Sequence, residues 1–421
     1  MAKKVQPDVE SFARIRVVGT GGSGCNAINH MINSKVKGVE FVAVNTDAQD
    51  LHRSLAKKKI HIGKNVTRGL GAGMNPEIGQ RAAEETREEI QEVLKGSDMV
   101  FITCGLGGGT GTGAAPVVAS IAQELGALTV AVVTKPFSFE GKQRMDIAEM
   151  GLARLKDTVD AYIVISNDKL LTVVDQNTTS KSAFAMCDDI LRQAVEGVSD
   201  IITTAGEINT DFNDIKSVME NAGPALMGVG VGDGDERAKD AAQTAINSPL
   251  LDVSIAGSKG VLIAVAGSDD MGILEIQQAA DVVREGIDDE AKIIFGTMHD
   301  SKLKKGQIRV IVIATGFPEK GSMVTNATPP ERGASLFSLT RKEQEDERDK
   351  IYNSVIPKQK QEEDAPVAKS EDKEEEEEEE DDAHHDIVRD EDDDDEFDRK
   401  DDDDDRGSWG AIPSFLKRNQ K

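Results

Sequence analysis

Cysteine is scarce in this sequence, and long apolar runs are missing from it. Only three of the 421 residues are cysteines, Cys25, Cys104 and Cys187. An odd number of cysteines without metal-site spacing indicates reduced thiols rather than a disulfide framework. No stretch approaches the roughly 20 apolar residues of a membrane-spanning helix, and the first residues contain no apolar region typical of a signal peptide. The sequence therefore predicts a soluble, cytoplasmic protein that does not insert into a membrane.

Basic surface is also in short supply. The formal net charge is −27, and residues 362–406 alone contain 28 Asp or Glu against 6 Lys or Arg. The rest of the chain is only mildly acidic, and no basic stripe or arm stands out apart from the last few residues. Because nucleic-acid binding needs a basic surface, we expect no nucleic-acid partner.

The chain is long enough for two packed domains and a tail. Apolar, β-branched runs alternate with helical patterns, which predicts an α/β fold whose parallel strands are covered by helices on both faces. The expected strands are 15–18, 40–45, 99–103, 128–134 and 161–165, then 226–231, 261–266, 292–295 and 308–314. The expected helices include 76–95, 113–125, 236–246 and 273–285. This pattern predicts a Rossmann-like parallel-sheet domain followed by a second α/β domain.

A long amphipathic helix should join these two domains. Residues 177–180 form a cluster of N-cap side chains, and apolar residues follow at spacings of three and four as far as Ile202. The predicted organisation is a disordered N-terminus at 1–11, a nucleotide-binding domain at 12–179, the central helix at 180–204 and a second domain at 205–317.

The apolar periodicity stops after Pro318. Residues 318–407 have too few apolar side chains to offset their ordering entropy, so we expect a disordered, self-repelling acidic linker with room for one short helix at 339–352. The final segment, 408–421, differs because it carries the only tryptophan, Trp409, and a compact apolar group followed by basic residues.

Two glycine-rich loops follow predicted strands. The first, Gly19 to Gly24, has the spacing G-x-G-x-x-G and suits a dinucleotide-binding oxidoreductase equally well, with Asp47 as the ribose-binding acid. The second, Gly105 to Gly113, opens a helix and adds the hydroxyls of Thr110 and Thr112 to a cradle of backbone N–H groups. Two such cradles on neighbouring strands suit a triphosphate. The G-x-x-x-x-G-K-[ST] loop is absent, so the chain is not an ordinary P-loop enzyme.

The chain resembles the tubulin/FtsZ family over residues 12–317 and again at its C-terminal peptide. Beyond the second glycine loop, the matching segments are 45–47, 69–73, 135–141, 167–170 and 209–214. The resemblance implies a GTPase that polymerises head-to-tail and forms the bacterial division (Z) ring at midcell. It also implies GTP or GDP with Mg²⁺, the metal being held mainly by the nucleotide and not by side chains.

The resemblance further assigns the GTP-binding residues. Those expected at the phosphates are Gly22, Ser23, Gly24, Cys25, Asn26, Gly109, Thr110 and Gly111, those at the ribose and phosphate end are Glu140 and Arg144, and those at the base are Asn26, Asn167 and Asp188. A carboxylate accepts from both guanine N1–H and the exocyclic amine, so Asp188 favours GTP over ATP. The alternative is that Asp188 and Asp189 form an exposed helix face.

No region of the sequence combines the phosphate loops with an obvious catalytic base. The resemblance implies that Asn209, Asp211 and Asp214 of one subunit reach the γ-phosphate of the next and position the attacking water. Hydrolysis would then require assembly, and the heterologous contact would propagate into a protofilament. A simpler interpretation, in which Asp211 and Asp214 are the N-cap and first-turn acids of a helix, remains open.

Other features are less specific. The three cysteines flank the predicted nucleotide, so their modification would block GTP binding unless they are merely small buried residues.

The C-terminal peptide resembles the family's adaptor-binding tail, although Ala411 stands where an acid is usual. Its expected contacts with a membrane-tethering division adaptor are Trp409, Ile412, Pro413, Phe415, Leu416, Lys417 and Arg418.

Two other functions compete with the division GTPase. A nicotinamide-dependent oxidoreductase would use the first glycine loop, but it leaves the second loop and residues 209–214 without a role. A tubulin-like filament protein that positions plasmid or phage DNA is the other alternative, and the C-terminal peptide 412–418 argues against it.

Overall fold

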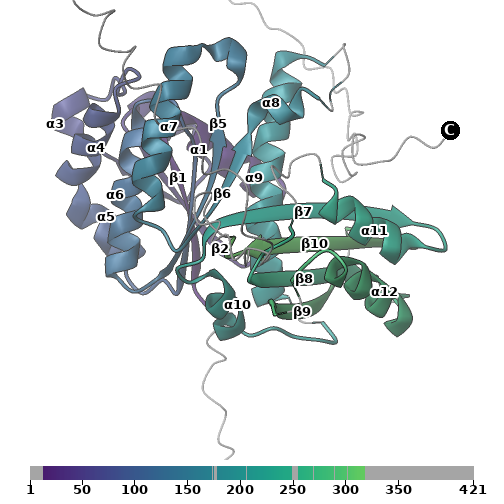
Figure 1. Ribbon diagram of the computed structural model, residues 1–421. Helices are drawn as coiled ribbons and strands as arrows, with labels where there is room; N and C mark the ends of the chain where they lie inside the picture. The colour runs from purple at the N-terminus through teal and green to yellow at the C-terminus, as the bar shows by residue number, and fades with distance from the viewer. Residues whose placement is uncertain are drawn as a thin grey trace, which may run out of the picture. The chain divides into compact units, whose positions relative to one another are not determined.

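The computed structural model describes residues 13–317, except 173, 175–177, 205, 249–254, 269, 289 and 301. The predicted N-terminal segment 1–11, the acidic linker 318–407 with its helix 339–352, and the peptide 408–421 lie outside the described residues. One ten-stranded sheet organises the described part, with the strand order β3-β2-β1-β4-β5-β6-β7-β10-β8-β9 (Figure 1). No helix among these residues is both long and apolar enough to cross a bilayer.

The first half supplies six strands, each parallel to its neighbours. They are β1 (Ile15–Thr20), β2 (Val39–Asn45), β3 (Lys58–His61), β4 (Met99–Gly105), β5 (Leu128–Lys135) and β6 (Ala161–Ser166). The helices between them are α1 (Gly21–Asn33), α2 (Ala48–Arg53), α3 (Lys64–Thr67), α4 (Pro76–Glu85), α5 (Arg87–Leu94), α6 (Thr110–Glu124), α7 (Lys142–Lys156) and α8 (Asn167–Leu170), with a short 3-10 turn η1 (Ser138–Glu140).

Helices cover both faces of this half, as the nearly continuous apolar strands predict. Neighbouring residues of a strand point to opposite faces, so Val17 and Val18 enter different cores. Val17 packs in the core that includes α1 and the central helix, and Val18 packs in the core formed with α4 to α7.

The second half continues the same sheet. Its elements are α9 (Ser180–Thr203), α10 (Phe212–Met219), β7 (Gly223–Asp233), α11 (Arg237–Ile246), β8 (Gly260–Gly267), α12 (Ile273–Arg284), β9 (Lys292–His299) and β10 (Gln307–Thr315). β7 joins β6 through only two residue pairs, Ala161 with Gly223 and Tyr162 with Pro224. β10 lies between β7 and β8 and is antiparallel to both, whereas β8 and β9 are parallel.

The central helix α9 lies between the two halves (Figure 1). Its apolar residues share one core with β1 and β5 of the first half and with β7, β8 and β10 of the second. The side chain of Thr179, the N-cap, accepts a hydrogen bond from the Ser182 N–H, as the predicted cap cluster requires. At 24 residues, α9 is about 36 Å long.

The predicted α/β fold class and long central helix are confirmed, and three local features differ from the prediction. The helix expected at 76–95 is divided at Thr86, whose hydroxyl donates to Ala82 O and accepts from Gly63 N–H. A side chain that bonds the backbone in this way competes with the helical ladder. β3 was not predicted, because its lysine-rich edge strand is too short to show periodicity. α6 begins at Thr110, three residues before the expected start at 113.

Candidate functional site

The predicted GTP-binding residues converge at one edge of the sheet. The first glycine loop, the second glycine loop, η1 and α8 follow the carboxyl ends of β1, β4, β5 and β6, which are adjacent strands. Parallel strands end at a common edge, which is where α/β proteins bind ligands. α9 reaches the same edge, because Phe184 on α9 packs against Phe137 beside η1.

The two glycine loops contact each other directly. Gly21 has a φ of +73°, and a Cβ there would lie 2.8 Å from the Gly111 N atom. A Cβ on Gly24 would lie 2.5 Å from the Thr103 carbonyl oxygen. Glycine is therefore required for this close packing. At Gly108 a Cβ would meet nothing within 4 Å, so this part of the cradle is open to a ligand.

The side chains around the first loop divide into exposed and buried groups. Ser23 and Asn26 are exposed, whereas Cys25 is completely buried. Burial raises the pKa of the Cys25 thiol to about 12, as it also does for Cys104 and Cys187. Cys25 can therefore offer only its backbone to a ligand. Buried, protonated thiols favour the interpretation of all three cysteines as packing residues.

The second loop presents one threonine and uses the other internally. Thr112 is 1% exposed, and its hydroxyl accepts a hydrogen bond of 2.9 Å from the Gly107 N–H. The expectation that Thr112 adds a hydroxyl to the anion cradle is therefore wrong, because that hydroxyl closes the loop. Thr110 is half-buried, and its hydroxyl lies 2.6 Å from the hydroxyl of Thr46, which follows β2.

Two buried polar atoms near the expected ribose and base lack partners. Glu140 accepts from the Phe137 N–H at 3.0 Å and forms an ion pair of 3.1 Å with Arg144. Among the described residues, however, Arg144 Nε and Asn167 Oδ1 are buried without a hydrogen-bond partner. Buried polar atoms are nearly always hydrogen-bonded, so a ligand with polar groups at both positions fits this site.

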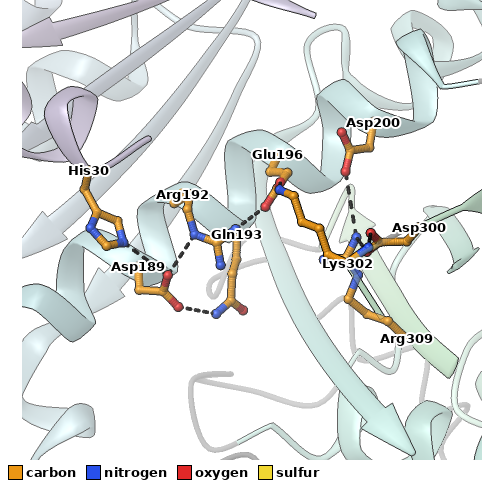
Figure 2. Close-up of polar contacts among 9 residues, drawn as sticks. All are labelled: His30, Asp189, Arg192, Gln193, Glu196, Asp200, Asp300, Lys302 and Arg309. Carbon is orange, nitrogen blue, oxygen red and sulfur yellow. Dashed lines mark hydrogen bonds and ion pairs between the residues drawn. The ribbon is translucent and has the colours of Figure 1, made fainter. Parts of the chain in front are cut away.

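Asp188 and Asp189 are both half-buried, so the alternative of an exposed helix face is wrong. Asp189 accepts from His30 Nε2 at 3.2 Å, Arg192 Nε at 2.7 Å and Gln193 Nε2 at 2.7 Å (Figure 2). Burial opposes ionisation of Asp189, but these donors hold its pKa well below the usual range. Burial, with a smaller contribution from the charge of Asp189, raises the pKa of Asp188 to about 6 against the opposing effect of His30.

The sequence analysis did not assign Phe184 or Thr46 to the site, although both lie at this edge of the sheet. The Phe137 ring stacks on Phe139 with centroids 4.9 Å apart and meets the Phe184 ring edge-on at 5.4 Å. Phe184 precedes Asp188 by four residues on α9, a spacing that places both on one face of a helix and that could have identified it. Thr46 could have been found from its position immediately after β2.

The ribose-binding role that a dinucleotide enzyme would give Asp47 finds no support. Asp47 is the N-cap of α2, and its carboxylate accepts from the Gln49 N–H at 2.8 Å and the Asp50 N–H at 3.1 Å. The carboxylate thus satisfies the first N–H groups of a helix.

The acidic loop, residues 206–214, lies toward the amino ends of the first-half strands, opposite the glycine loops. Asn209, Asp211 and Asp214 are exposed between the end of α9 and the first turn of α10. After α10, the Gly223 N–H donates to the carbonyl of Asp160, the residue immediately before β6. These contacts place α10 near the amino ends of the strands, away from the glycine loops (Figure 1).

Part of the acidic loop has a structural role. Asp211 is the N-cap of α10 and accepts from the Asp214 N–H at 2.9 Å, while Asn209 Oδ1 accepts from the Gly206 N–H at 2.8 Å. Asp211 and Asp214 are therefore the N-cap and first-turn acids of α10, as the simpler interpretation holds. It leaves one carboxylate oxygen of Asp211 and the Asp214 side chain facing solvent.

Two sets of ion pairs lie along α9 between Asp189 and Asp200 (Figure 2). Arg192 bonds both Asp189 and Glu196, and Glu196 also accepts from Lys302 Nζ at 2.5 Å. Farther along the helix, Asp200 lies 3.7 Å from Arg309, which pairs with Asp300. Polar contacts thus connect α9 to α1 of the first half and to the β9–β10 segment of the second.

Comparison with known proteins identifies the family. Residues 14–175 match the model for the GTPase domain of the Tubulin/FtsZ family, and residues 223–318 match that for the FtsZ family C-terminal domain. A solved empty FtsZ dimer from M. jannaschii is 51% identical with a TM-score of 0.70, and the match covers 73% of this chain and 89% of that chain. A point mutant of that FtsZ is 50% identical with the same TM-score, covering 73% and 92%.

A more distant structure shares the fold alone. CetZ2 from Haloferax volcanii, solved as a GTPγS-bound protofilament, is 20% identical with a TM-score of 0.62, covering 73% of this chain and 94% of that chain. Given the two family-model matches and the identity to FtsZ over most of its length, this chain belongs to the tubulin/FtsZ family and is a GTPase that binds GTP and GDP.

Proposed function

We propose that the chain polymerises head-to-tail with GTP, that it hydrolyses GTP at the contact between subunits, and that its filaments form the cell-division ring at midcell. One observation carries this proposal. The glycine loops lie at the carboxyl ends of the first-half strands, and the only predicted catalytic acids lie at the amino ends. One copy therefore has half of a site at each edge.

In the binding half, the proposed contacts follow from the exposed groups. Backbone N–H groups of Gly22 to Asn26 and Gly109 to Gly111 would bind the phosphates at two helix N-termini. Arg144 Nε and Asn167 Oδ1 would gain the partners that they lack among the described residues. Asp188 would accept from guanine N1–H and the exocyclic amine, which excludes adenine.

In the catalytic half, Asp211 and Asp214 of the next copy would polarise and position the attacking water, with Asn209 helping to hold the loop. The described residues include no cluster of three His, Cys, Asp or Glu side chains that could hold a metal ion. We propose that phosphate oxygens of the nucleotide are the main ligands of Mg²⁺, which would neutralise their charge when bound.

The two edges of a copy differ, so contact between unlike edges repeats without closing unless the filament curves into a ring. Known relatives support self-association: one solved FtsZ is a dimer, and CetZ2 was solved as a protofilament. We further propose that the C-terminal peptide, with Ile412 and Phe415 among its contacts, attaches the filament to a membrane-tethering adaptor.

The test measures GTP turnover and sedimentable polymer against protein concentration. Both should show the same critical concentration, because the site forms only on assembly. Asp211→Ala should bind GTP normally and lower turnover about 100-fold, the scale expected for a mispositioned reacting group. Asp240→Ala, which removes an exposed acid from the outer helix α11, is the matched control. Turnover that stays linear down to the lowest concentration, or that survives Asp211→Ala, would refute the shared site.

A further inference from the structure

The acidic loop lies along the open edge of β9. Among the strands that the structure describes, β9 is the last of the sheet and β8 is its one neighbour. On its other side, the Thr297 N–H donates to Ile208 O at 2.9 Å, and the Thr297 hydroxyl accepts from the Ile208 N–H at 2.8 Å. The Thr210 hydroxyl donates to Phe295 O at 3.3 Å. Three hydrogen bonds thus attach the loop to the edge strand.

Two glycines, Gly206 in the loop and Gly296 in the strand, allow a close approach. A Cβ on Gly206 would lie 1.9 Å from the Thr297 carbonyl oxygen, and a Cβ on Gly296 would lie 2.8 Å from the Thr210 hydroxyl. Such an approach leaves the loop no room to shift toward the strand. The position of the loop therefore depends on β9, which belongs to the second half of the protein.

The hydroxyl groups that make this attachment are shielded from water. Thr297 is 3% exposed and Thr210 is 8% exposed. Removing one partner of a shielded hydrogen bond leaves the other unsatisfied, so the loop would have to move to find a new partner. Asn209 and Asp211 are on either side of Thr210 and would move with it.

We infer that Thr297 is a positioning residue for the GTPase reaction and that Thr210 assists it. Thr297 touches neither nucleotide nor water in this scheme, because it acts through the loop that carries Asn209 and Asp211. The inference rests on the proposed function, since the loop position matters only if these groups reach a neighbour's nucleotide. It also ties catalysis to the second half of the protein, which supplies β9.

A positioning role for Thr297 predicts a change in GTP turnover without a change in GTP binding. The proposed GTP-binding groups lie at the carboxyl ends of the first-half strands, away from the acidic loop. A displaced loop should therefore lower kcat and leave nucleotide affinity unchanged. Displacement of a reacting group by about 1 Å costs up to about 100-fold in rate. Loss of one of three loop contacts should cost less, and we expect about a 10-fold fall.

The experiment compares Thr297→Val with Thr297→Ser. Valine keeps the shape of threonine but lacks the hydroxyl, and serine keeps the hydroxyl. Above the critical concentration, Thr297→Val should lower kcat about 10-fold with unchanged GTP affinity and polymer yield, and Thr297→Ser should stay within about 2-fold of wild type. Thr129→Val is the control, because it removes a buried hydroxyl that donates only to Ala127 O.

Each outcome decides between explanations. If Asp211→Ala abolishes turnover but Thr297→Val does not lower it, the positioning role is wrong and the shared site stands. If Asp211→Ala itself turns over normally, the proposed function fails. If Thr297→Val lowers the melting temperature and GTP affinity along with kcat, its role is structural and the inference is wrong.

Gly296→Ala provides an independent variant should Thr297→Val not fold. Its methyl group would press on the Thr210 hydroxyl and displace the loop without removing any hydrogen-bonding group. The inference requires the same loss of kcat at unchanged GTP affinity from this variant, and full turnover would overturn it.

Discussion

At the residue scale, α9 places two neighbouring carboxyl groups, Asp188 and Asp189, in environments that shift their pKa values in opposite directions. Asp189 is surrounded by donors and ionises readily, while Asp188 has no comparable set and its pKa is raised to about 6. Partial burial makes the ionised form of a carboxyl group more costly. Under the proposed function, guanine would supply further donors to Asp188, whereas the donors to Asp189 come from the protein itself.

Substitution Asp188→Asn should stabilise the nucleotide-free protein at neutral pH. Burial raises the folded-state pKa above the ordinary 3.8, so ionisation costs stability as the pH rises from about 4 to about 6. The gain in unfolding free energy should be about 3 kcal/mol at pH 7 and become small near pH 4. Urea unfolding at several pH values measures it, and an equal gain at all pH values would contradict this account.

At the element scale, α11 packs on β7 through a seam of glycine and alanine. Gly228, Gly230 and Gly232 alternate along β7 and face Ala241 and Ala245 of the helix. A Cβ at Gly230 would lie 2.0 Å from the Ala241 carbonyl oxygen. Because that obstacle is backbone, the whole helix would have to move.

Substitution Gly230→Ala should therefore lower the unfolding free energy by about 1–3 kcal/mol through overpacking. Gly272→Ala is a matched control, since its nearest neighbour is the end of the Glu275 side chain at 3.5 Å and its φ is −87°. Chemical denaturation of both variants makes the comparison. Equal stabilities would mean that α11 shifts freely.

At the scale of the whole molecule, the two sites are held apart by the length of α9. The helix begins beside the nucleotide edge and ends near the amino end of β2, where Gly38 packs on Thr203. A rigid helix of about 36 Å cannot bring the two edges of one copy together. Each copy must therefore exchange half-sites with another if both are used.

Complementation between two inactive variants tests this exchange. Gly21→Ala should block GTP binding by clashing with the second loop, and Asp211→Ala should remove the catalytic acid. Gly21→Ala alone should not turn over GTP, and Asp211→Ala alone should keep only about 1% of wild-type turnover. In an equal, randomly ordered mixture, about a quarter of the contacts pair an intact nucleotide site with an intact loop, so about a quarter of wild-type turnover should return. Sedimented filaments that contain both variants and are as inactive as either variant alone would contradict sharing between copies.

The ends of the strands and the loops that follow them could be predicted from the sequence, because the residue patterns that specify them are local. Glycine spacing after an apolar strand predicts a tight turn into a helix N-terminus, and both loops are found there. The alternation of apolar segments was sufficient for the fold class, and the cap cluster at 177–180 was sufficient to locate the start of α9, whose N-cap is Thr179. Each of these features depends on residues within one or two turns of each other.

Tertiary structure alone decided which polar groups remain free. Thr110 and Thr112 are equivalent in sequence, yet Thr112 closes its own loop and Thr110 meets Thr46 from another strand. The antiparallel insertion of β10 leaves β9 as the edge strand, and only there can Thr297 hold the acidic loop. Such assignments depend on hydrogen-bond partners distant in the chain, and no local pattern encodes them.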